Sequence, residues 1–120
     1  MMGIRRAAGA IILAALLGAC SGGDKTPTQT GGPWPSLADV FMPNVSVYSP
    51  YETDIALAGT VRFNFPADEH NVVFRNRVAG TPADIGITKS SVVSLVFGTA
   101  GSFPYYCTLH PQMTGLVVVH

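Results

Sequence analysis

The fold class can be inferred from residues 101–119, which read GSFPYYCTLHPQMTGLVVV. A β-type run at 103–107 leads into a short polar stretch, and a second β-type run follows at 116–119. Runs of β-branched and aromatic residues between turn residues are typical of strands. The stretch therefore predicts two strands joined by a loop, and that loop carries a Cys, a His and a Met.

Five further short runs toward the N-terminus have strand-like patterns: they alternate or are rich in β-branched residues. These runs are residues 45–48, 53–57, 61–65, 71–74 and 91–97. Seven short runs without a convincing 3.6-residue period predict an all-β sandwich. Residues 75–89 contain Gly80, Pro82 and Gly86, and we expect a crossing loop there. Pro104 cannot donate to a ladder, so we expect it at an edge or a bulge.

The N-terminal residues have the features of a secretory signal peptide. Two arginines precede an apolar run that ends at Cys20 and is too short for a membrane span of about 20 residues. The sequence Leu17-Gly18-Ala19-Cys20 resembles the lipobox of bacterial lipoproteins, in which the Cys is lipidated. We therefore expect a lipoprotein signal peptide at 1–19, a lipid on Cys20 and an extracytoplasmic protein anchored to a bacterial membrane.

The next residues, 20–36, are rich in Gly, Pro, Ser and Thr and predict a flexible linker before a domain at 37–120. Removal of residues 1–19 leaves five basic residues against seven acidic ones. There is no basic patch, so we expect no nucleic-acid binding.

The loop at 107–113 is interpreted as part of a metal site. With Cys20 lipidated, Cys107 has no disulfide partner, and a metal would occupy its otherwise free thiol. The spacing C-x2-H-x2-M formed by Cys107, His110 and Met113 would arise by chance about 0.002 times in a shuffled chain of this composition. A thiolate and imidazoles with a weak thioether are the ligands of a blue-copper site.

A second histidine is needed, and His70 precedes the predicted strand 71–74, whereas we expect the terminal His120 to lie in solvent. Zinc usually takes a hard ligand, a thiolate or water in the fourth position, so Met113 favours copper. A thiol enzyme needs an exposed nucleophile and an orienting group, and no such signature surrounds Cys107. We therefore expect no catalytic turnover.

HNVVF at 70–74, together with the stretch at 101–119, resembles the cupredoxin family, and within it the amicyanin and plastocyanin-type proteins. The resemblance implies a Greek-key β-sandwich of about seven or eight strands that binds one mononuclear type 1 copper ion. It implies His70, Cys107, His110 and Met113 as ligands. It also implies single-electron transfer with redox protein partners, and we expect a monomer.

The resemblance further implies two kinds of residue around the ligands. Asn71 would tie the two ligand segments together and bring its backbone N–H to the Cys107 sulfur. An apolar rim around His110 would be formed by Leu109, Pro111, Met42 and Pro43.

Leu109 departs from the family, whose loops usually have Pro there. Its N–H is expected to donate to the Cys107 thiolate and raise the reduction potential, so that Leu109→Pro lowers it without loss of copper.

One alternative function uses the same ligands. A copper-carrier lipoprotein would hold copper for delivery and have no role in electron transfer. Carriers tend to be rich in Met and His with exchangeable sites, whereas here a single set of four ligands stands alone. The composition favours electron transfer.

Overall fold

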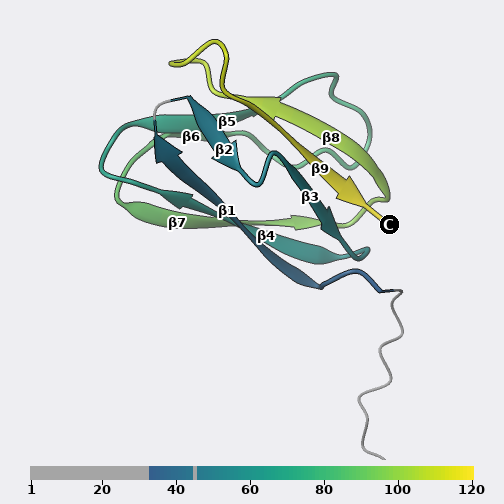
Figure 1. Cartoon of the computed structure of the whole chain (residues 1–120). Coiled ribbons are helices and arrows are strands. Elements are labelled where there is room, and N and C mark those ends of the chain that lie inside the picture. Colours follow the sequence, from purple (N-terminus) through teal and green to yellow (C-terminus); the bar gives the residue numbers. More distant parts are fainter. Residues whose placement is uncertain (1–32, 45) are drawn as a thin grey trace, which may run out of the picture.

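The computed structural model describes residues 33–44 and 46–120. These residues form nine strands and no helix. The strands are β1 (Leu37–Asn44), β2 (Val47–Ser49), β3 (Glu52–Ile55), β4 (Gly59–Phe65), β5 (His70–Phe74), β6 (Ile85–Thr88), β7 (Ser91–Phe97), β8 (Gly101–Tyr106) and β9 (Thr114–Val119). They make two sheets, ordered β2-β1-β4-β7 and β3-β9-β8-β5-β6, which pack face to face (Figure 1).

The predicted all-β sandwich is confirmed, and alternating burial explains why it forms. Every second residue of β4 is buried, and β9 shows the same alternation. Because successive side chains of a strand point to opposite faces, this pattern turns one face of each strand inward. The core contains fully buried side chains from both sheets, among them Val40, Phe63, Phe97, Tyr105 and Val117. Each such side chain contributes roughly 1.5–3 kcal/mol by leaving water.

Two of the nine strands, β1 and β6, were not predicted, so the count exceeds the expected seven or eight. β1 begins with a mixed apolar and polar run and contains Pro43, which obscures its alternation. β6 lies within 75–89, the segment expected to be a loop. It is four residues long and forms by pairing with β5, His70 opposite Thr88 and Val72 opposite Ile85. Such pairing depends on tertiary contacts, and a local pattern does not reveal it.

Pro104 does not lie in an edge strand, because β8 lies between β9 and β5. Its partner in β9 is Leu116, but Leu116 N donates away from it, to Tyr51 O. On the other side, Arg75 N donates to Pro104 O at 2.8 Å, one residue beyond the end of β5. The pairing of β8 with β5 covers only Tyr105 and Tyr106. The proline is tolerated inside the sheet because the neighbouring strand ends next to it.

The last residues of the predicted linker contact the domain. Ala56 N donates to Pro35 O and Thr60 N donates to Ser36 O, both at 2.9 Å. The Trp34 indole stacks on the His120 ring, with centroids 3.8 Å apart. His120 is exposed, as expected, and its Nε2 also contacts Asp54 Oδ1 at 2.7 Å.

Cys20 and the predicted signal peptide lie outside the described residues. Within the part of the chain that is described, no helix has the length and hydropathy needed to cross a bilayer.

Candidate metal centre

The loop between β8 and β9 is closed at its base by backbone hydrogen bonds. Cys107 N donates to Met113 O at 3.0 Å, and Met113 N donates to His110 O at 2.8 Å. The first bond extends the ladder that pairs Tyr106 with Thr114, and the second closes a turn within the loop. Cys107 and Met113 are fully buried, and His110 is half-buried. The two sheet strands thus hold three of the predicted ligand residues in a short loop at one end of the sandwich (Figure 1).

His70 begins β5 and is fully buried. Neither of its ring nitrogens has a hydrogen-bond partner. Burial lowers the pKa of His70, and the neighbouring His110 lowers it further. The imidazole is therefore neutral at neutral pH and keeps a lone pair free for a metal. Buried polar groups without partners are rare and costly, so this histidine fits a ligand better than a structural residue.

His70, Cys107 and His110 converge although His70 comes from a different strand. Their potential ligand atoms all lie within 4.8 Å of one another. Cys107 Sγ is 3.5 Å from His110 Nδ1, and the two imidazole centroids are 4.9 Å apart. One thiol and two imidazoles, with the thioether of Met113 buried at the end of the same loop, match the donor set of a type 1 copper site.

Asn71 joins the two ligand segments with its side chain. Its Nδ2 donates to Thr108 Oγ1 at 2.7 Å, and Thr108 N donates to Asn71 Oδ1 at 2.8 Å. The two hydrogen bonds form a closed pair between the residue that follows His70 and the residue that follows Cys107. Such contacts behind the ligands orient them and hold their separation.

Two residues that contact Asn71, Tyr48 and Thr108, were not predicted from the sequence. The Tyr48 hydroxyl donates to Asn71 O, across 23 residues of chain. Tyr48 is buried, and burial, followed by the nearby Cys107, raises the pKa of its phenol. Thr108 was visible within the loop motif, but nothing local indicated its partner. A lone tyrosine in a predicted strand carries no signal of what its hydroxyl reaches.

The predicted hydrogen bonds to the thiol are not observed. Among the hydrogen bonds of residues 33–44 and 46–120, neither the N–H of Leu109 nor that of Asn71 donates to Cys107 Sγ. Leu109 is 42% exposed. The described hydrogen bonds therefore give no support to tuning of the potential by Leu109.

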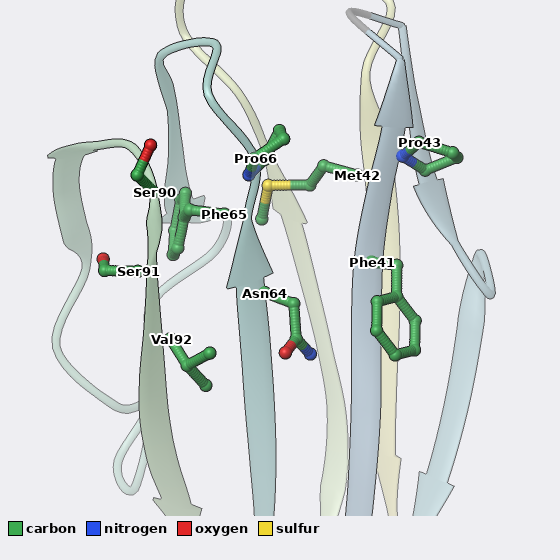
Figure 2. A pocket seen from close by; sticks show the side chains of 9 residues that line it. All are labelled: Phe41, Met42, Pro43, Asn64, Phe65, Pro66, Ser90, Ser91 and Val92. Atoms are coloured by element: carbon green, nitrogen blue, oxygen red, sulfur yellow. The ribbon is translucent and has the colours of Figure 1, made fainter.

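The predicted apolar rim is correct only in part. A hollow beside the ligand loop is lined by Ser46, Leu109, His110, Pro111, Gln112 and Met113. Met42 and Pro43 instead line a separate groove between β1, β4 and β7, where Figure 2 shows Met42 pointing toward Phe65 and Pro66. Met42 is only 3% exposed and lies at the bottom of that groove. It does not line the hollow that contains His110.

No family model matches the sequence. Amicyanin from Paracoccus versutus is 42% identical over 52 residues, which are 42% of this chain and 39% of that protein. Amicyanin from Paracoccus denitrificans is 40% identical over 75 residues, which are 60% of this chain and 57% of that protein.

The comparison with solved structures covers more of the domain. A variant of amicyanin in its reduced Cu(I) form at pH 4 matches with a TM-score of 0.60 and 30% identity, over 70% of this chain and 82% of that chain. The chain belongs to the amicyanin-like cupredoxins. The family resemblance seen in the sequence is thereby confirmed. This cupredoxin spans about half the length of the two curated amicyanins that it matches.

Proposed function

We propose that this chain is a blue copper protein that carries single electrons between redox proteins. One type 1 copper ion would be held by His70, Cys107, His110 and Met113. The observation that carries the proposal is His70, whose two ring nitrogens have no partner although the ring is buried beside a thiol and a second imidazole. Membership of a family that includes a copper-containing amicyanin supports the choice of metal.

The chain's own residues would hold the site in one geometry. When bound, copper supplies one-electron chemistry by alternating between Cu(I) and Cu(II). The ladder bonds at Cys107 and Met113 and the Asn71–Thr108 pair fix the loop from two sides. A frame held from two sides changes little between oxidation states, which favours fast electron transfer.

His110 would be the route for electrons to a partner. It is the half-exposed member of the cluster, and it lines the hollow formed by the loop and Ser46. The other lining residues carry no formal charge. A partner would therefore dock here mainly through apolar and neutral polar contacts.

The lipid anchor on Cys20 and an extracytoplasmic location on a bacterial membrane belong to the same proposal. Trp34 and Pro35, which precede the first strand, lie beside the C-terminal His120. Figure 1 shows this region at the end of the sandwich away from the ligand loop. An anchored protein would thus keep its metal centre on the side turned away from the tether.

The experiment is titration of the purified metal-free protein with Cu(II). We expect an intense visible thiolate-to-copper band at one equivalent and a reversible one-electron wave in voltammetry. Cys107→Ser should remove the band. A colourless wild-type complex, or one that does not cycle, would contradict the proposal.

The copper-carrier alternative predicts a different result. A carrier must release its metal to an acceptor. Here Cys107 and His70 are fully buried, so an acceptor cannot reach them directly. We expect Cu(I) to transfer slowly to a chelator compared with the rate of electron exchange. Rapid transfer together with a poor voltammetric response would favour the carrier.

A further inference from the structure

Tyr48 connects the two sheets at the end where the candidate ligands lie. It belongs to β2, which pairs with β1, whereas His70 lies in the opposite sheet and Cys107 directly follows β8 of that sheet. The Tyr48 side chain is 1% exposed, and its ring meets the Tyr105 ring edge-on with centroids 4.8 Å apart. Its hydroxyl donates to Asn71 O.

This hydrogen bond ends at the residue that links both ligand segments. Asn71 directly follows His70, and its side chain is paired with Thr108, which directly follows Cys107. A movement of the Asn71 backbone would therefore be transmitted to His70 through the chain and to Cys107 through Thr108. Tyr48 restrains that backbone from the opposite sheet.

We propose that Tyr48 is a positioning residue of the metal centre, whose hydroxyl holds Asn71 and thereby sets the separation of His70 and Cys107. This inference rests on the proposed copper site for its functional meaning. The restraint itself is a property of the metal-free protein and is open to a separate measurement.

Tyr105 provides a matched control. It is also fully buried and contacts the Tyr48 ring, but its hydroxyl has no hydrogen-bond partner. Tyr48→Phe and Tyr105→Phe each remove one buried hydroxyl and keep the ring. Only Tyr48→Phe removes a hydrogen bond to the segment that holds the ligands.

The first measurement is amide hydrogen exchange of Thr108 in the metal-free full chain. We expect the Thr108 amide, which donates to Asn71 Oδ1, to exchange faster in Tyr48→Phe and at the wild-type rate in Tyr105→Phe. The second is copper affinity with the visible spectrum. We expect Tyr48→Phe to lose about tenfold in affinity and to shift the band, the usual result of loosening contacts behind a ligand. Tyr105→Phe should stay within about twofold.

The outcomes separate the two proposals. If wild-type protein gave no blue-copper band, the proposed function would fail, and exchange at Thr108 would still test the restraint by Tyr48. If the two variants behaved alike in exchange, affinity and spectrum, the role of Tyr48 would be overturned.

If Tyr48→Phe does not fold, a substitution that keeps the tyrosine hydroxyl is needed. In that case 3-fluorotyrosine would be placed at position 48 and, as control, at position 105, which keeps both hydroxyls but makes each a stronger donor. A shift of the visible copper band with 3-fluorotyrosine at position 48, but not at position 105, supports the positioning role. Equal spectra for the two substituted proteins contradict it.

Discussion

At the scale of single residues, the most informative group is the imidazole of His70. It has no hydrogen-bond partner, yet burial makes its charged form unfavourable. The metal-free protein thus buries a neutral imidazole whose nitrogens have no hydrogen-bond partner. Such a residue reduces stability in the absence of a ligand and favours binding when one is present.

The lowered pKa of His70 predicts a pH dependence of metal-free stability. The folded pKa lies below the ordinary value of 6.5, so the unfolded state binds the proton first as the pH falls. The free energy of unfolding should therefore decrease as the pH falls from about 7.5 through 6.5 and level off below the folded pKa. Urea unfolding across this range measures it. His70→Gln should reduce the slope, and an equal slope in wild type and variant would contradict the prediction.

Met113 offers a second prediction at this scale. Met113→Leu keeps the buried volume similar but removes the thioether, while the thiol and two imidazoles remain. We expect the variant to bind copper and to have a higher reduction potential, because loss of an electron-pair donor favours Cu(I). Each tenfold change in relative preference corresponds to about 59 mV for one electron. Voltammetry measures the shift, and loss of copper or a lower potential would contradict the assignment.

At the scale of elements, the β8–β9 hairpin carries three residues of the candidate metal centre, and most of this hairpin could be predicted. Three of the proposed ligand residues lie in one stretch of seven residues, so the local pattern of strand, loop and strand was sufficient. β6 and the tolerance of Pro104 could not be predicted, because both depend on where β5 runs and ends. The close packing of Gly115 against Tyr105 lies within the hairpin itself, where the two residues are cross-strand partners.

Gly115 gives a prediction for this hairpin. A Cβ added there would overlap the ring of Tyr105, which is itself packed against Tyr48. Gly115→Ala should therefore lower the free energy of unfolding by about 1–3 kcal/mol through overpacking. Gly98→Ala is the control, since a Cβ there has nothing within 4 Å. Chemical denaturation measures the free energy of unfolding of both variants. Equal values would contradict the prediction and show that the hairpin adjusts to the added methyl group at little cost.

At the scale of the whole molecule, the sandwich separates the ligand loop from the contact between the two ends of the described chain. Trp34 stacks on His120, and His120 N donates to Ile55 O at 3.0 Å. The segment that precedes β1 is thus attached to the domain before the first strand begins. This contact joins residues 86 positions apart and has no local signature.

The single tryptophan makes this contact measurable. His120→Ala should change the emission of Trp34 by removing its stacked partner, and lower stability by about 0.5–1.5 kcal/mol. Asp54→Asn leaves the rings in place and should change the emission less. Fluorescence of the metal-free protein tests this. Unchanged emission in His120→Ala would show that the two rings do not stack in solution.

The sequence by itself determined the fold class, the family, and the short loop that carries Cys107, His110 and Met113. These features follow from local strand patterns and from rare residues at close spacing, and neither requires knowledge of distant contacts. The family resemblance also implied that His70 and Asn71 join this loop. Only the tertiary structure shows how closely His70 approaches it, that Thr108 is the partner of Asn71 and that Tyr48 reaches Asn71. Those contacts join residues 23 to 40 positions apart. The pairing of β5 with β8 brings His70 and Asn71 beside the loop, and the packing of the two sheets brings Tyr48 to Asn71.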